Sequence, residues 1–200
     1  MFLHSTQDAI AACKLWIDKK AICLDTETTG LGSDAQIIEI AITDLNKNIL
    51  FNQRIKPTTE IEYGALSVHG ITPESLINCP SWPDIADEIN RITTGRDVII
   101  FNTEFDYRLM QQTARAFNSD TSWIDENIRY NCAMKCAALV YGSTNRYGTI
   151  SLANATARAG VVWEGDAHSA AADALADEAL VVVAVEPFAA AGTIAVDDAR

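Results

Sequence analysis

Two acidic residues directly follow a short apolar segment near the N-terminus, and they constrain the fold more than any other feature. Residues 21–24 are apolar and suit a buried strand, and Asp25 and Glu27 come after them. Residues i and i+2 of an extended chain lie on one face, so both carboxylates should point the same way. Their repulsion favours protonation or a divalent cation, and oxygen ligands indicate Mg²⁺ or Mn²⁺. The alternative is a strand that ends in a polar turn with both carboxylates solvated.

The order of predicted elements indicates an α/β layer structure with a mixed sheet. In such a sheet, ligands bind at the carboxyl ends of the parallel strands, where Asp25 lies. Periodicity and turn residues predict strands at 21–24, 37–45, 49–55 and 97–101, with a hairpin turn at 46–48. They predict helices at 6–20, 63–68, 72–77, 82–92, 102–117, 132–141, 151–159 and 170–185.

The length of 200 residues favours one domain, which we expect to cover residues 1–186, with a loosely ordered tail at 187–200. No apolar run reaches the length of a membrane span, and the start lacks the features of a secretory signal. We therefore expect a cytoplasmic protein with no membrane partner.

The cysteines and the net charge exclude further classes of site. The five cysteines form no C-x-x-C pair and no zinc spacing, so reduced thiols are expected, with Cys132 and Cys136 as core residues on one helical face. The net charge of −12 speaks against a large basic surface for nucleic acid. It does not exclude nucleic acid as a substrate.

Further acidic residues follow a second strand and begin the last helix. Asp106 comes soon after the strand that ends at Phe101, although Asn102 as a helix cap and Asp106 in the first turn would explain this segment equally well. Asp173 is the first acid of an alanine-rich helix, and close packing of that helix would bury it without a partner. His168 precedes it, and the alternative for His168 is an ordinary loop histidine.

Taken together, these segments resemble the DEDDh 3′–5′ exonucleases, the superfamily of the proofreading epsilon subunits of bacterial replicative polymerases and of exodeoxyribonuclease X. The resemblance implies a ribonuclease H-like fold, with a five-stranded mixed sheet whose second strand is antiparallel. The segments that carry it are LDTETTG (24–30), VHGIT (68–72), FNTEFD (101–106) and AHSAAADA (167–174).

This chain departs from the family pattern at one position. The family often has histidine before the asparagine of the second motif, whereas this chain has Phe101, which puts substrate contact or local packing there in question. The tyrosine subclass is disfavoured, because the residue four before Asp173 is Ser169.

The resemblance implies a two-metal mechanism, in which two Mg²⁺ ions, replaceable by Mn²⁺, stabilise both ends of an in-line displacement. Asp25 would bind both ions, and Glu27, Asp106 and Asp173 would complete the shells. His168 is the candidate general base. Five residues correspond to about 140° beyond a full turn of helix, so His168 should lie on the loop before the helix that carries Asp173.

The resemblance also implies a pocket for a free 3′ end. Backbone near Thr28 would hold the terminal sugar, and Leu31 and Phe105 would pack against the last bases. Ordinary core packing is the alternative for these two apolar residues. His69 would lie near the substrate or close a turn with Gly70, and the turn is favoured.

The predicted function is metal-dependent hydrolysis of the 3′ end of DNA with release of nucleoside 5′-monophosphates, either alone or beside a polymerase or repair complex. One alternative is an exoribonuclease that trims short RNA, since these motifs do not read the 2′ hydroxyl. Another is a binding or assembly subunit that uses the fold as a scaffold. Loss of a metal ligand would mark such a subunit, and here Asp25, Glu27, Asp106, His168 and Asp173 are all present.

Overall fold

The structure is a computed structural model, and it describes residues 3–162 and 168–185. The tail expected at 187–200 lies outside the described residues. Among the helices that are described, none has the length and apolar character needed to span a membrane.

A five-stranded mixed sheet forms the centre of the molecule, with the strand order β3-β2-β1-β4-β5. β2 runs antiparallel to β1 and β3, whereas β4 runs parallel to β1 and β5 parallel to β4. This confirms the predicted sheet and its antiparallel second strand. The strands are β1 (Ile22–Thr28), β2 (Ile37–Asp44), β3 (Ile49–Arg54), β4 (Asp97–Ile100) and β5 (Arg129–Cys132).

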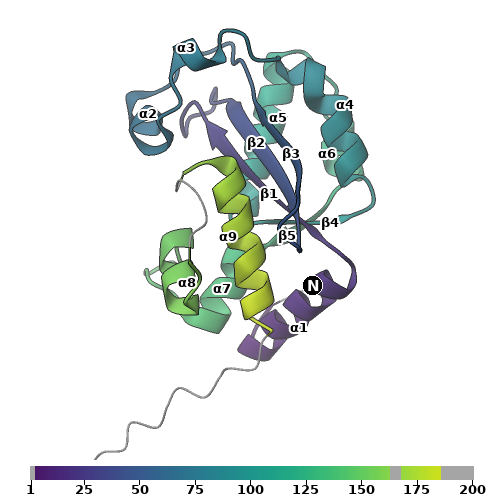
Figure 1. Ribbon diagram of the computed structural model, residues 1–200, viewed down its shortest axis with the longest axis vertical. Helices are drawn as coiled ribbons and strands as arrows, with labels where there is room; N and C mark the ends of the chain where they lie inside the picture. Colours follow the sequence, from purple (N-terminus) through teal and green to yellow (C-terminus); the bar gives the residue numbers. More distant parts are fainter. Residues whose placement is uncertain (1–2, 163–167, 186–200) are drawn as a thin grey trace, which may run out of the picture.

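Helices cover both faces of this sheet (Figure 1). The described helices are α1 (Thr6–Asp18), α2 (Tyr63–His69), α3 (Pro73–Leu76), α4 (Trp82–Thr93), α5 (Thr103–Ala116), α6 (Ser122–Glu126), α7 (Ala133–Tyr141), α8 (Leu152–Ala159) and α9 (Ala170–Val183).

Alternate residues of β1 pack into two different cores, as the twofold period of a strand requires. Ile22 and Leu24 face a core shared with α4 and α5. Cys23 faces the other core, which α1, α7 and α9 complete. Because Asp25 and Glu27 continue the alternation that Cys23 begins, they lie on the α9 face of the sheet.

Local sequence explains where the last helix begins. Ser169 is the residue before α9, and its hydroxyl accepts a hydrogen bond from the Ala172 N–H at 3.3 Å. The small side chains that follow allow α9 to pack closely on β1 and β2. The helix therefore starts close to the two acids of β1.

The structure corrects three expectations. β1 continues to Thr28, so the paired acids lie within the strand and not beyond its end. β5 and α6 were not predicted from local pattern, because β5 is a four-residue edge strand without an apolar run. Cys132 is the last residue of β5, so it does not share a helical face with Cys136, which is buried in α7.

Candidate active site

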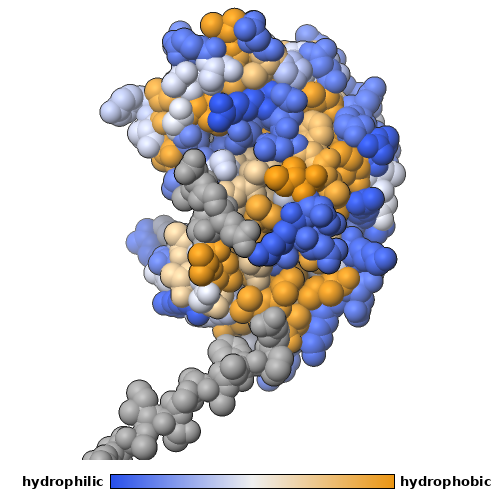
Figure 2. Space-filling view, in the orientation of Figure 1, coloured by the Kyte–Doolittle hydropathy of each residue, from blue (hydrophilic) through white to orange (hydrophobic). Residues whose placement is uncertain are grey.

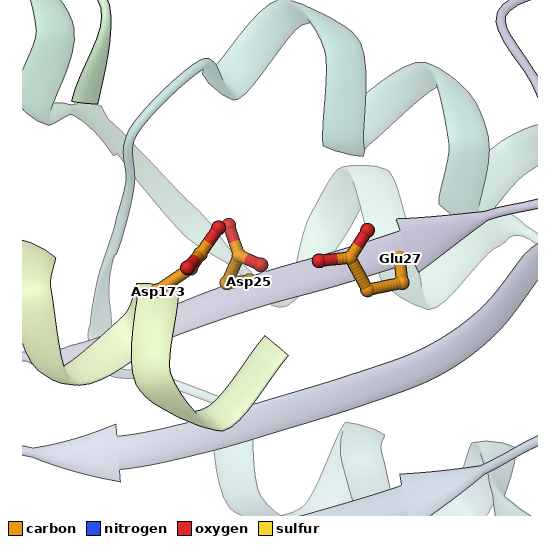
Figure 3. A group of neighbouring side chains, drawn as sticks. All are labelled: Asp25, Glu27 and Asp173. Carbon is orange, nitrogen blue, oxygen red and sulfur yellow. The ribbon is translucent and has the colours of Figure 1, made fainter. Parts of the chain in front are cut away.

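Three carboxylates meet between β1 and the first turn of α9. Asp25, Glu27 and Asp173 each offer an oxygen, and these oxygens lie within 4.8 Å of one another. Figure 3 shows Asp25 and Glu27 projecting from the same side of β1 toward Asp173 on the helix. All three side chains are half-buried. The predicted shared face of Asp25 and Glu27 is confirmed, and Asp173 joins them from a segment distant in sequence.

Burial and mutual repulsion disfavour ionisation of this group. Burial, followed by the charges of Asp106 and Asp173, raises the pKa of Asp25 well above its usual value. Burial and the Asp173 charge raise the pKa of Glu27 to about 8. The pKa of Asp173 is also raised, chiefly by burial. No lysine or arginine in the described residues forms an ion pair with any of the three.

Asp106 lies near this group but is not one of its three members. It is buried in the first turn of α5, and its Oδ1 accepts a 2.7 Å hydrogen bond from the Thr26 hydroxyl. Burial raises the pKa of Asp106 to about 7, and the Thr26 hydroxyl opposes that shift. Asp106 therefore approaches the strand from the core that contains α5, and its role as a fourth metal ligand stays a prediction.

His168 lies on the turn before α9, as its spacing from Asp173 predicted. Its side chain is exposed, and its backbone has a φ of 66°. The backbone N–H of His168 donates to Asp173 Oδ1 at 3.3 Å. This bond ties the turn to the acidic group, while the role of the imidazole as general base stays a prediction.

A glutamate on β2, which sequence reasoning missed, also faces the group. Glu39 pairs directly with Glu27 across β1 and β2, and Arg54 pairs directly with Glu39 across β2 and β3. The three side chains form one row across the strands. A single glutamate inside the apolar run from Ile37 to Ile42 was the available signal, because such a position is buried and a charge there needs a partner.

A second missed acid lies one helical turn beyond Asp173. Asp177 is fully buried, and neither carboxylate oxygen has a hydrogen-bond partner among the described residues. Burial and the Asp106 charge raise its pKa well above the usual value, although the backbone of Phe101 opposes the shift. The signal was an acid four residues after Asp173 on an otherwise apolar helix.

The predicted substrate residues surround the end of β1. Leu31 is 74% exposed, so the alternative that it packs in the core is wrong. Phe105 is half-buried against the core, and the Arg108 guanidinium lies 5.3 Å from the centre of its ring. The Thr28 hydroxyl donates to the Gly30 carbonyl at 2.8 Å, so that side chain stabilises the loop.

His69 closes a turn, as favoured, and also contacts β1. Its Nδ1 accepts from the Ile71 N–H at 2.9 Å, beside Gly70 in the left-handed region at φ 67°. Its Nε2 lies 3.1 Å from the Thr28 carbonyl, and because Nδ1 is the acceptor, Nε2 carries the proton and donates. His69 therefore connects α2 to the strand that carries the acids.

All three carboxylates of the acidic group are half-buried, so none of them is sealed from solvent. The outline of the molecule is indented on the side where α2 and α8 lie (Figures 1 and 2). The all-oxygen donor set at this spacing suits Mg²⁺ or Mn²⁺.

Comparison with known sequences places this arrangement among nucleases. The profile of the RNase_T family, described as exonuclease, matches residues 22–181. The chain is 38% identical over 165 residues to an uncharacterized exonuclease, CP81, of Escherichia phage 186, which covers 80% of this chain and 85% of the relative. It is 34% identical over 101 residues to the DNA polymerase III epsilon subunit of Escherichia coli K12, which covers 46% of this chain and 42% of that subunit.

Solved structures share the fold at low sequence identity. Exonuclease I of E. coli in complex with a dT13 oligonucleotide has a TM-score of 0.65 at 19% identity, over 82% of this chain and 41% of that one. Exonuclease X with 5′ overhanging duplex DNA has a TM-score of 0.60 at 21% identity, over 82% of this chain and 90% of that one. The nuclease domain of 3′hExo, a DEDDh family member bound to rAMP, has a TM-score of 0.65 at 14% identity, over 82% of this chain and 90% of that one.

Proposed function

The chain belongs to the RNase_T exonuclease family, and on this basis we propose that it is a metal-dependent 3′–5′ exonuclease of the DEDDh type that acts on DNA. The observation that carries the proposal is the group formed by Asp25, Glu27 and Asp173, whose oxygens lie within 4.8 Å without an ion-paired lysine or arginine among the described residues. A site of this kind needs external cations before its acids can be ionised together.

The residues present fit a pair of Mg²⁺ ions, with Mn²⁺ as a substitute. The ligands would be Asp25, Glu27 and Asp173, with Asp106 as the fourth. Bound cations would neutralise the charge that develops on the attacking water and on the leaving oxygen. The chain contributes the oxygen donors and fixes their positions on β1, α5 and α9.

His168 would act as the general base in this proposal. Its imidazole takes a proton from the water, the water oxygen bonds to phosphorus, and the bond from phosphorus to the 3′ oxygen breaks. The 3′ oxygen leaves with the bonding electron pair and takes up a proton from solvent. The products are a nucleoside 5′-monophosphate and a chain shortened by one nucleotide with a free 3′ hydroxyl. The exposed turn that carries His168 supports this role, because the side chain can reach a water at the rim of the group.

The free 3′ end would lie along the end of β1. Thr28 backbone would contact the terminal sugar, while Leu31 and Phe105 would contact the last bases, with His69 holding the strand end in place. The exposure of Leu31 supports this assignment, because an apolar side chain in water is available for stacking.

We propose DNA as the substrate because the similar structures include nucleases with a dT13 oligonucleotide and with duplex DNA. An exoribonuclease is the second candidate, since 3′hExo was crystallised with rAMP. The resemblance to epsilon subunits supports a polymerase or repair complex as partner, although the matched region covers less than half of the E. coli subunit.

The proposal includes residues 1–186 as the catalytic domain, in agreement with the family match at 22–181. It also places the protein in the cytoplasm, which the five free cysteines support.

A panel of end-labelled substrates tests the proposal. Single- and double-stranded DNA and RNA are incubated with Mg²⁺, Mn²⁺ or EDTA, and Asp25→Asn serves as the inactive control. We expect 5′-monophosphates to be released from the 3′ end, with DNA preferred and no activity in EDTA. Full activity in EDTA, or digestion that starts at 5′ ends, would overturn the proposal, and preference for RNA would establish the second candidate.

A further inference from the structure

Glu39 faces the acidic group from the next strand, yet both of its oxygens are already engaged. Its side chain is buried, and it lies directly opposite Glu27 in the register of β1 and β2. Oε1 accepts a hydrogen bond from the Arg54 Nε at 3.0 Å. Oε2 accepts one from the backbone N–H of Ala170, also at 3.0 Å. The carboxylate is therefore held between β3 and the start of α9.

The contact with Ala170 satisfies a group that the helix cannot satisfy itself. Ala170 is the first residue of α9 and is fully buried, and the first N–H groups of a helix have no partner within it. A carboxylate is also favoured at the positive end of the helix dipole. Loss of this acceptor would leave a buried donor unpaired, which costs about 1–3 kcal/mol.

The same contact determines where two residues of the acidic site lie. Asp173 is three residues beyond Ala170, in the first turn of the helix, and His168 is two residues before it. The His168 N–H also donates to Asp173 Oδ1. Fixing Ala170 against β2 therefore fixes both residues relative to Asp25 and Glu27 on β1.

We propose that the Arg54–Glu39 pair is a positioning unit, which anchors the start of α9 so that Asp173 and His168 meet the acids of β1. Its effect on catalysis rests on the proposed function, whereas its effect on the start of α9 does not. Arg54 orients the carboxylate and neutralises it beside Glu27, and the carboxylate holds Ala170. Glu39 is not a member of the acidic group, and we assign it no metal ion.

Two replacements of Glu39 separate this role from that of a metal ligand. The amide oxygen of Glu39→Gln can still accept from Ala170, whereas Glu39→Ala cannot. We expect Glu39→Ala to lower kcat about 10–100-fold, the usual effect of losing an outer partner of a metal site, with KM for the oligonucleotide changed less than about threefold. Glu39→Gln should recover most of that loss. If Gln is as damaging as Ala while it still holds the Ala170 N–H, the charge itself is needed and the positioning role is wrong.

Amide exchange followed by NMR tests the anchor without any catalysis. The exchange rate of the Ala170 amide should rise by about tenfold or more in Glu39→Ala, corresponding to about 1.4 kcal/mol, and should stay near the parent value in Glu39→Gln. An unchanged Ala170 amide in Glu39→Ala would overturn the proposal. If the parent protein shows no nuclease activity, the proposed function fails, and this measurement still decides the positioning role.

An ion pair on another face of the molecule provides the matched control. Arg91 and Glu88 are paired on α4, where their side chains are 70% and 44% exposed. Arg54→Met should lower kcat about 3–10-fold, because the carboxylate keeps Ala170 but loses its orientation, whereas Arg91→Met should change kcat less than twofold. Equal effects of the two arginine replacements, or a loss of melting temperature in Arg54→Met without a change in kcat, would contradict the proposal.

Discussion

Buried carboxylates lie at both ends of the parallel strands, and the molecule compensates them in different ways. At the start of β4, Asp97 is 8% exposed, and its Oδ2 lies 3.5 Å from Lys19 Nζ and 3.4 Å from Arg129 Nη2. Asn131 Nδ2 lies 3.3 Å from its other oxygen. At the opposite end, Asp25, Glu27 and Asp173 have no such cation among the described residues.

This difference separates a structural charge from a functional one. At the Asp97 end, the protein's own lysine and arginine side chains compensate the carboxylate. The acidic group is half-buried, and it depends on protonation or on cations from solution. Glu39 lies between the two cases, because Arg54 and a helix N-terminus compensate it within the active region.

The largest expected effect is loss of activity when a member of the acidic group is neutralised. Asp25→Asn and Asp173→Asn should each reduce turnover by about 10⁴-fold or more, the size seen when one member of a catalytic unit is removed. Asp97→Asn should keep turnover within about threefold, because it lies at the other end of the sheet. Rates with Mn²⁺ on an end-labelled oligonucleotide measure this. Similar losses for Asp97→Asn and Asp25→Asn would show that the two ends of the sheet do not differ in function.

The second expectation distinguishes the histidine from the acids. His168→Ala should lower kcat by roughly 10²–10⁴-fold, the contribution of a positioned general base. Binding of Mn²⁺ should stay close to that of the parent, since the carboxylates supply the ligands, and calorimetric titration measures it.

The pH–rate profile completes this test and needs saturating metal. The ligand acids also bind protons near neutrality, so the acid limb reports His168 only when metal binding is complete. That limb should be lost in His168→Ala. A mutant with the parent rate, or with the same acid limb, would leave His168 as an ordinary turn residue.

Local pattern predicted most of the fold and the shared face of Asp25 and Glu27, whereas the resemblance joined Asp173 to them. Period-two alternation placed Asp25 and Glu27 on one face, and the alanine-rich stretch indicated the helix that carries Asp173. β5 was not predicted because its four residues carry no apolar pattern, and only its pairing with β4 makes it a strand. Its existence followed from the resemblance alone.

Contacts between distant residues could not be predicted from pattern. Glu39 binds the Ala170 N–H across 131 residues, and Thr26 binds Asp106 across 80. In the sequence, Glu39 is simply a polar residue in a strand, and Asp106 an acid in a first turn. Which partners they find depends on packing of α9 and α5 against the sheet, and local periodicity holds no information about it.

The third expectation concerns pH in the absence of metal. Burial raises the pKa of Glu27 from 4.5 to about 8 and that of Asp106 from 3.8 to about 7. The folded state then holds more protons than the unfolded state between those limits, so the free energy of unfolding should fall as pH rises from about 4 to 8. The slope is at most about 1.4 kcal/mol per pH unit for each group. Denaturant midpoints in EDTA at several pH values measure it.

The same denaturation series, repeated with Mn²⁺ in place of EDTA, tests the effect of the metal. Cations replace the protons on the acids. The free energy of unfolding should therefore fall less with rising pH, or should rise, when metal is present. Stability that rises with pH in EDTA would show that the acids have partners within the folded protein.

The smallest expected effect is a change in the free energy of unfolding, which should have opposite signs for Asp177→Asn and Asp97→Asn. Asp177 is fully buried without a hydrogen-bond partner among the described residues, and its pKa is raised well above 3.8. Burial therefore disfavours the ionised carboxylate in the folded state, and Asp177→Asn removes that cost. Asp97→Asn instead removes a charge that Lys19 and Arg129 stabilise.

In EDTA at pH 7.5 we expect Asp177→Asn to gain about 1 kcal/mol and Asp97→Asn to lose about 1–3 kcal/mol in free energy of unfolding. At pH 4.5 the advantage of the Asp177 variant should be smaller, and it should vanish below about pH 3.8, where the carboxyl is already protonated in the unfolded chain. Chemical denaturation of both variants beside the parent measures the two signs. Destabilisation by Asp177→Asn at pH 7.5 would mean that its carboxylate is stabilised as Asp97 is, and the distinction between the two ends would not hold.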